Sequence, residues 1–292
     1  MAREVPGGSA SFIARLLGFV RLVHPFPSAL DAVAVAAIAA VAGADVSVTV
    51  RLAVGMLGLQ FAIGTANDLA DTPRDRGTRP RKPIPTGLVD AGHARAVLII
   101  VASAGLASAA SVGFGPLVVA ALGLSDGFVY DLRLKGTPLS WLPFAIGVAL
   151  LPVYAWLGAT GGLPVAFWGI VPLALLAGSV LAVANAVADM GVDRQATASS
   201  VATLLGRRGS IAVDTAGLVA VQFTVVATSA FAGLDPVAAA AELAGIVLGF
   251  AGLALIAYPN ERVARLGWET QAIAIVALGA GWMSSLGSAG LL

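Results

Sequence analysis

Long apolar stretches separated by short polar segments make up most of this 292-residue chain. A helix needs about 20 predominantly apolar residues to cross the hydrocarbon core of a membrane, and nine stretches approach or reach that length. Turns that contain Gly and Pro separate several of them. The pattern predicts an all-α integral membrane protein with nine transmembrane helices in a single polytopic domain, residues 1–292. The approximate limits of the nine spans are 27–44, 50–69, 91–112, 115–131, 139–158, 163–188, 210–232, 236–257 and 270–290.

The composition supports a membrane protein. Hydrophobic residues make up 58% of the chain, charged residues 11%, and the mean hydropathy is +0.92, whereas soluble domains carry about 25% charged residues. The absence of cysteine excludes disulfides, thiolate metal sites and a cysteine nucleophile. A net charge of +1 gives no indication of nucleic-acid binding, and we expect no nucleic-acid partner.

The basic residues predict the orientation. If the N-terminus is cytoplasmic, 16 of the 17 Lys and Arg residues fall on inner segments and only Arg51 lies outside, as the positive-inside rule requires. The segment of about 1–26 then resembles a cytosolic lead-in more than a signal peptide. We expect a prokaryotic cell membrane, an external C-terminus, and inner loops at about 70–90 and 189–209 that form a cytoplasmic cap.

Two acidic segments, residues 67–75 and 185–193, share the pattern N-x-x-x-D-x-x-x-D at an offset of 118 residues. Residues four apart lie on one face of a helix, so each segment directs an amide and carboxylates the same way, and Asp68 joins the first set. Carboxylates this close repel, and Mg²⁺, which commonly binds carboxylates together with substrate phosphates, would neutralise them. Two facing clusters would form a diphosphate site; two solvated acidic loops are the alternative. The motif residues are Asn67, Asp71 and Asp75 in the first segment and Asn185, Asp189 and Asp193 in the second.

Two basic segments accompany these acids on the inner side. Residues 79–87 read RPRKPIPTG, and their prolines restrict the loop. Residues 130–135 read YDLRLK. Lys and Arg there could hold phosphate oxygens, or they could reflect inside-positive topology alone. Tyr130 is either an interfacial anchor or a hydrogen-bond donor to phosphate.

Taken in order along the chain, these segments resemble the UbiA superfamily of intramembrane prenyltransferases. The resemblance implies a helical bundle around a central cavity with a cytoplasmic cap. It also implies Mg²⁺-dependent transfer of an isoprenyl group from an allylic isoprenyl diphosphate to an acceptor, often an aromatic ring, with release of diphosphate. Membrane lipid surrounds such an enzyme, while the donor chain length, the acceptor and the oligomeric state stay open.

The resemblance assigns roles to individual residues. The expected metal ligands are Asp68, Asp71, Asp75, Asp189 and Asp193. The expected catalytic residues are Asp71, Asp189, Lys135 and Tyr130. The expected diphosphate-binding residues are Asn67, Arg79, Arg81, Lys82, Arg133, Asn185, Arg194 and Arg21.

Three features depart from the family pattern. Pro73 interrupts the first acidic segment, so Asp75 is expected to leave the face of Asp71 if the proline breaks the helix. The spacing from Tyr130 to the lysine is five residues instead of the commoner four, which leaves Arg133 and Lys135 as alternatives for phosphate contact. Residues 194–200 lack a Gly-Lys pair that is frequent in chlorophyll- and quinone-pathway members.

Two other functions remain possible at this point. A terpene cyclase on the same scaffold would use the same residues without a separate acceptor, and nothing in the sequence separates it from a transferase. A cation transporter fits less well, because transporters usually hold their ions near the bilayer midplane, whereas both acidic segments are predicted at one membrane face.

Overall fold

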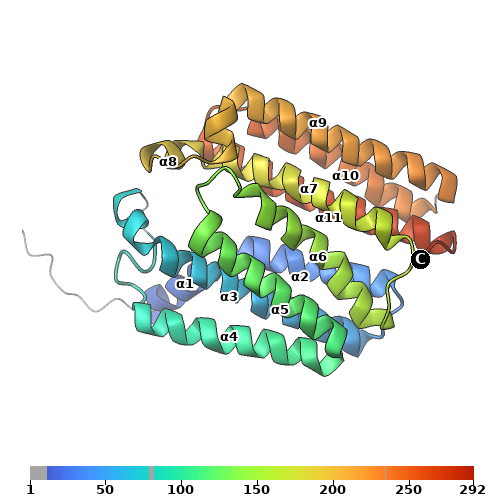
Figure 1. Ribbon diagram of the computed structural model, residues 1–292, viewed down its shortest axis with the longest axis horizontal. Helices are drawn as coiled ribbons and strands as arrows, with labels where there is room; N and C mark the ends of the chain where they lie inside the picture. The colour runs from blue at the N-terminus through green and yellow to red at the C-terminus, as the bar shows by residue number, and fades with distance from the viewer. Residues whose placement is uncertain (1–11, 79–81, 234) are drawn as a thin grey trace, which may run out of the picture.

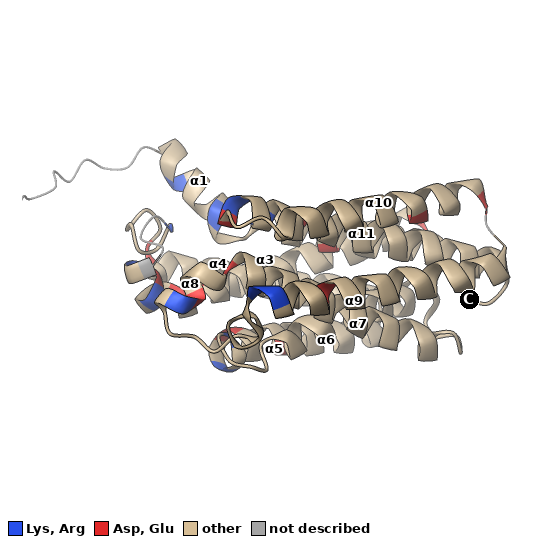
Figure 2. Cartoon of the chain, turned by 90° about the horizontal axis from the view of Figure 1, so that it is seen from above, with Lys and Arg blue, Asp and Glu red and all other residues tan. Residues whose placement is uncertain are grey.

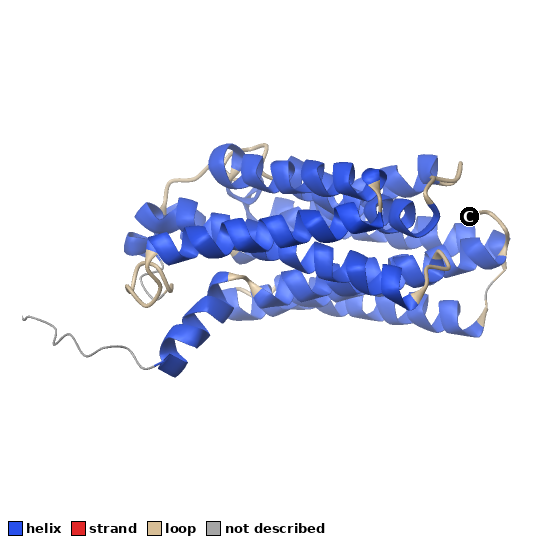
Figure 3. Ribbon diagram, turned by 90° about the horizontal axis from the view of Figure 1, so that it is seen from below, coloured by secondary structure: helices blue, strands red, loops and turns tan. Residues whose placement is uncertain are grey.

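The computed structural model describes residues 12–78, 82–233 and 235–292, and the described chain is helical with connecting loops (Figure 3). The element bounds are α1 Phe12–Leu22, α2 Pro25–Val41, α3 Val46–Thr78, α4 Ala91–Val112, α5 Phe114–Val129, the π-helix η1 Tyr130–Leu134, α6 Trp141–Thr160, α7 Phe167–Ala188, α8 Met190–Gln195, α9 Val201–Ala232, α10 Pro236–Ile256 and α11 Glu261–Ser288.

Nine of these helices, α2–α7 and α9–α11, run side by side along the long axis of the molecule (Figure 1). The most extensive contacts join α10 with α11, α3 with α4, α6 with α7, and α2 with α3. The short helices α1 and α8 lie at one end of this bundle, and the C-terminus lies at the other. Lys and Arg gather at the end that carries α1 and α8 (Figure 2), in agreement with the charge distribution expected from the sequence.

Glycines allow two of these helix pairs to approach closely. A Cβ atom at Gly105 of α4 would lie 2.9 Å from the carbonyl oxygen of Gly55 in α3. In the same way, a Cβ at Gly252 of α10 would lie 2.7 Å from the carbonyl oxygen of Gly267 in α11. Because lipid supplies no hydrophobic drive between helices, such backbone-to-backbone packing contributes to holding a membrane bundle together.

The number of candidate spans is smaller than predicted. Seven helices of the described chain are long and apolar enough to cross a membrane, or eight if α1 and α2, which meet at a bend of 54°, form one span. Helix α5 has 16 residues and is too short for this group. The all-helical membrane fold is therefore confirmed, whereas the count of nine is not.

Several helices extend beyond their predicted limits into the expected inner loops. Helix α3 has 33 residues, so it is about 50 Å long at 1.5 Å per residue and exceeds the hydrocarbon thickness. Helix α9 begins at Val201 and bends at Gly206, whose φ is +67°. The segments 70–90 and 189–209 are thus partly helical, and the expected cytoplasmic cap is not confirmed.

Candidate active site

A polar pocket lies at the end of the bundle that carries α8. Residues of α3, α6, α7 and α8 line it, together with η1 and the turn after η1. Both acidic segments contribute, so residues 118 apart in the sequence meet at one site. The lining residues are Asp71, Arg74, Asp75, Tyr130, Lys135, Gly136, Ser140, Phe144, Ala182, Asn185, Ala186, Asp189, Val192, Asp193 and Ser200.

The first acidic segment lies on the continuous helix α3, which includes Pro73. Lys82 Nζ lies 2.7 Å from Asp68 Oδ1, 3.9 Å from Asp71 Oδ2 and 2.9 Å from Asp75 Oδ2. The three carboxylates therefore face one ammonium group, and the expectation that Pro73 turns Asp75 away was wrong. The helix tolerates the proline close to its end, where only one turn follows.

Lys82 neutralises a buried acidic cluster. The carboxylates of Asp68 and Asp75 are almost completely buried, and unpaired charges in such a place are costly. Burial alone would lower the pKa of Lys82, but the attraction and hydrogen bonds of Asp68 and Asp75 outweigh burial and raise this pKa. His24 adds a further contact, because its Nε2 lies 3.0 Å from Asp68 Oδ1.

The second acidic segment divides between two helices. Asn185 lies on the last turn of α7, Asp189 between α7 and α8, and Asp193 on α8. The amide of Asp193 donates to the carbonyl of Asp189, N···O 2.9 Å, so one helical turn still separates the two carboxylates. Both line the pocket with Asn185.

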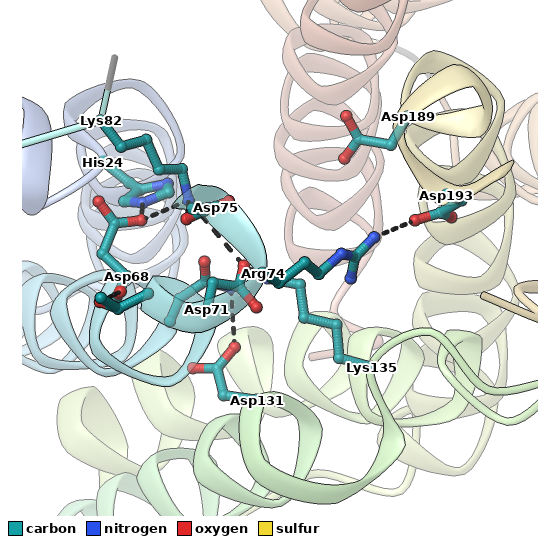
Figure 4. Close-up of polar contacts among 12 residues, drawn as sticks. His24, Asp68, Asp71, Arg74, Asp75, Lys82, Asp131, Lys135, Asp189 and Asp193 are labelled. Carbon is teal, nitrogen blue, oxygen red and sulfur yellow. Dashed lines mark hydrogen bonds and ion pairs between the residues drawn. The ribbon is translucent and has the colours of Figure 1, made fainter. Parts of the chain in front are cut away.

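Arginine side chains connect this segment to other helices. Arg74 of α3 donates from Nη2 to Asp193 Oδ1 at 2.7 Å and so bridges the two acidic segments (Figure 4). Arg265 of α11 forms an ion pair with Asp189. Each carboxylate of the second segment thus has an arginine partner from outside the segment.

The π-helix η1 explains the five-residue spacing between Tyr130 and Lys135. The amide of Lys135 donates to the carbonyl of Tyr130, N···O 2.8 Å, which is the i→i+5 bond of a π turn. This turn brings Lys135 Nζ to 2.5 Å from Asp71 Oδ2 and to 6.0 Å from the centroid of the Tyr130 ring. Lys135 lines the pocket, whereas Arg133 is exposed and does not.

Several predicted diphosphate-binding residues lie away from the pocket. Arg21 is exposed on α1, and Arg194 is exposed on α8. Asn67 is absent from the pocket lining and donates from Nδ2 to Asp131 Oδ1 at 2.8 Å. Arg79 and Arg81 lie outside the described residues.

A second, apolar pocket lies deeper in the bundle, lined by side chains of α2, α6, α7, α9 and α11. It begins close to the polar pocket along α6, where Val148 follows Phe144 by one turn. Trp282 lines its far part, and the indole Nε1 donates to Thr228 Oγ1 at 2.7 Å.

Comparison with known proteins identifies the family. The model of the UbiA prenyltransferase family matches residues 29–267. This chain belongs to the UbiA prenyltransferase family.

Relatives of known structure share its architecture. A UbiA homologue from Aeropyrum pernix K1 superposes with a TM-score of 0.73 at 20% identity, over 87% of this chain and 96% of that one. A UbiA homologue from Archaeoglobus fulgidus, bound to DMAPP and Mg²⁺, superposes with a TM-score of 0.69 at 16% identity, over 90% and 98% of the two chains. At these identities the likeness concerns the fold.

Among curated proteins, digeranylgeranylglyceryl phosphate synthase of Methanopyrus kandleri is 34% identical over 122 residues. The match spans 41% of this chain and 45% of that relative, so it covers somewhat less than half of either protein.

Three residues that contact the acidic segments were not predicted from the sequence. Arg74 directly follows Pro73 within the first acidic segment, and this position was a signal that could have been used. His24 precedes the proline that starts α2, with a left-handed φ of 50°, and only its place before Pro25 marks it. Arg265 has no motif around it, because only the packing of α11 brings it to Asp189.

The residue types of the pocket suit a divalent metal, although the chain's own cations hold the carboxylates here. Carboxylate and amide oxygens are the donors that Mg²⁺ prefers, and the pocket lining supplies them from Asp71, Asp75, Asn185, Asp189 and Asp193. In the described part of the chain, however, no three His, Cys, Asp or Glu side chains converge closely enough to hold a metal ion. The carboxylates instead form ion pairs with cationic side chains of the chain itself, namely Lys82, Lys135, Arg74 and Arg265.

Proposed function

We propose that this protein transfers an isoprenyl group from an allylic isoprenyl diphosphate to an acceptor inside the membrane and releases diphosphate, in a reaction that requires Mg²⁺. The observation that carries this proposal is the shared pocket. Two acidic segments from distant parts of the chain line it with Lys135 and Arg74, and a separate apolar pocket begins one turn further along α6. A diphosphate headgroup and an isoprenoid tail match these two environments.

Charge balance supports a metal-dependent reaction. In the described site four cationic side chains pair with five carboxylates, namely Lys82, Lys135, Arg74 and Arg265 with Asp68, Asp71, Asp75, Asp189 and Asp193. Addition of an anionic diphosphate alone would leave a large excess of negative charge in a poorly solvated place. Divalent cations would remove this excess and would stabilise the charge of the leaving diphosphate.

The side chains of the pocket have distinct parts in the proposed reaction. Asp71, Asp75, Asp189 and Asp193 would hold the divalent metal through their carboxylate oxygens, as the family resemblance suggests for their motifs. Lys135 and Arg74 then donate hydrogen bonds to phosphate oxygens, since charge-assisted bonds of this kind are the strong ones. Tyr130 and Phe144 border the place where the allylic carbon would lie, and aromatic faces attract a developing cation.

The orientation follows from the same arrangement. We infer that α2–α7 and α9–α11 all cross the membrane, with the polar pocket, α1 and α8 on the cytoplasmic side. The gathering of Lys and Arg at this end supports that orientation (Figure 2). Loop 82–90 and the α8 region would then cap the site from the cytoplasm.

The relatives suggest which substrates to test first. The Archaeoglobus homologue was determined with DMAPP and Mg²⁺, and the name of the Methanopyrus relative makes a digeranylgeranylglyceryl phosphate one product to look for. Purified protein in nanodiscs should be given allylic diphosphates of C5 to C20, with and without aromatic or lipid acceptors, and the products analysed by mass spectrometry.

We expect Mg²⁺-dependent diphosphate release and a prenylated acceptor, and we expect EDTA to stop both. A cyclised hydrocarbon or alcohol formed equally well without any acceptor would instead identify a terpene cyclase. Diphosphate release that persists in EDTA would contradict the proposed metal dependence.

A further inference from the structure

Arg265 contacts Asp189, one of the proposed metal ligands, although α11, which carries Arg265, contains none of the sequence motifs. It lies on the second turn of α11 and forms an ion pair with Asp189 of the second acidic segment. The arginine side chain is 39% exposed and the aspartate side chain 23%, so this pair lies at the pocket rim, where it is open to water and to incoming ligands.

The fold fixes the start of α11 against the second acidic segment. Asn260 caps the helix, and its Oδ1 accepts from the amides of Arg262 and Val263 at 2.9 Å and 3.3 Å. The carboxylate of Glu261 lies so close to Gly191 that a Cβ atom there would overlap it. Because Glu261 and Arg265 are four apart on one helix face, the contact at Gly191 also holds Arg265 beside Asp189.

A guanidinium held at this place and a divalent cation both require the oxygens of Asp189. We propose, on the basis of the function proposed above, that Arg265 is an intramolecular competitor of the divalent metal. It neutralises Asp189 while the site holds no metal, and it leaves the carboxylate when metal and diphosphate bind together. The released guanidinium can then pair with phosphate oxygens, so the metal binds weakly alone and more tightly with diphosphate.

The test measures the affinity of the full chain in nanodiscs for Mn²⁺ alone. Electron paramagnetic resonance reports the fraction of Mn²⁺ that is bound. Arg265→Gln should lower the Kd for Mn²⁺ about twofold to fivefold, the range expected for a partly exposed ion pair. Arg265→Met should do the same and serves as a second variant if the first does not fold. Arg265→Lys keeps the charge and should stay near the wild-type value.

Arg262→Gln is the matched control, since Arg262 is exposed one turn earlier on α11 and its loss removes the same charge. It should leave the Kd for Mn²⁺ nearly unchanged. An unchanged or higher Kd in Arg265→Gln overturns the competition, and so does an equal decrease in Arg262→Gln, which would indicate a general charge effect.

A further variant separates this inference from the proposed function. Asp71→Asn combined with Asp189→Asn should abolish Mn²⁺ binding. If it does so while Arg265→Gln has no effect, the metal site stands and the role of Arg265 fails. If the double variant binds Mn²⁺ like the wild type, the proposed metal site and the inference fail together.

Discussion

At the residue scale, the site depends on where each cation lies. Lys135 contacts Asp71, while Arg133, two residues earlier, is exposed and does not line the pocket. A cation positioned on a leaving group contributes about 10²- to 10³-fold to the rate when it acts as a preorganised donor. Lys135 is therefore the residue of the YDLRLK segment that should matter for turnover.

We predict that Lys135→Ala lowers kcat for diphosphate release by about 10²-fold or more, whereas Arg133→Ala stays within a few-fold of the wild type. Steady-state kinetics of both variants with one allylic diphosphate would measure this. A strong loss in Arg133→Ala with normal turnover in Lys135→Ala would reverse the assignment.

Lys82 has a stabilising role that can be measured without substrate. Its pKa is raised from the ordinary 10.5 by Asp68 and Asp75, against the effect of burial. A raised pKa in the folded state means that the ammonium stabilises the fold at every pH below its unfolded pKa, and that this contribution is lost only as the pH rises through the folded pKa.

We predict that Lys82→Met lowers the stability of the metal-free protein at pH 7 by about 3 kcal/mol, because it leaves buried carboxylates unpaired. The midpoint of thermal unfolding in detergent measures the change. Arg76→Met, at an exposed position near the end of α3, should unfold at the wild-type temperature. Equal midpoints for Lys82→Met and the wild type would show that Lys82 does not stabilise the cluster.

The residues that the sequence could not predict are those without a motif. The repeated N-x-x-x-D-x-x-x-D pattern identifies the carboxylates because the spacing itself places them on one helix face. Arg265 reaches Asp189 only because α11 packs beside α7, and no local pattern encodes that contact. His24 likewise depends on the left-handed turn between α1 and α2.

At the scale of the elements, three local departures from a regular α-helix shape the pocket. Helix α3 continues through Pro73, η1 inserts a π turn before Lys135, and the chain bends at Asp189 between α7 and α8. Hydrophobic periodicity locates helices, but it does not show whether a proline ends one or whether a turn is α or π. The expectation for Asp75 was wrong for this reason, and the choice between Arg133 and Lys135 stayed open.

The apolar pocket leads to a prediction about the donor chain. Trp282 lines its far part, and the hydrogen bond to Thr228 fixes the indole. If the isoprenoid tail occupies this pocket, a smaller side chain at position 282 should lengthen it.

Trp282→Leu should therefore raise the ratio of kcat/KM for the longest accepted donor to kcat/KM for the shortest by about tenfold. This size is expected because the added space would bury apolar groups worth about 1–2 kcal/mol. Competition assays with paired donors provide the ratio. Trp168→Leu is the control, because Trp168 is 86% exposed on α7. An unchanged donor preference in Trp282→Leu would place the tail elsewhere.

At the scale of the whole molecule, the hydrophobic pattern predicted the all-helical membrane fold, and the family model confirms the resemblance drawn from the motifs. Composition and run length suffice for this, because a chain with so few charges cannot form a soluble surface. The span count was harder to obtain, since α5 is shorter than a usual crossing and α3 is much longer than one.

The absence of cysteine makes the topology directly testable. Single cysteines at the exposed positions Phe114, at the start of α5, and Leu139, after η1, should react with a membrane-impermeant maleimide from opposite sides. We predict labelling at Phe114 in intact cells and at Leu139 only in inverted vesicles. Labelling of both from the same side would mean that α5 does not cross the membrane.

The most direct test of the whole account is a double-mutant cycle on Mg²⁺-dependent diphosphate release. If Asp71 and Asp189 act in one site, Asp71→Ala and Asp189→Ala should each abolish release, and the combined variant should be no worse than either, because residues that act as a unit are strongly non-additive. Asp235→Asn, which keeps an N-cap of α10 at the other end of the bundle, should retain full release. Normal release in Asp71→Ala and Asp189→Ala would contradict the account.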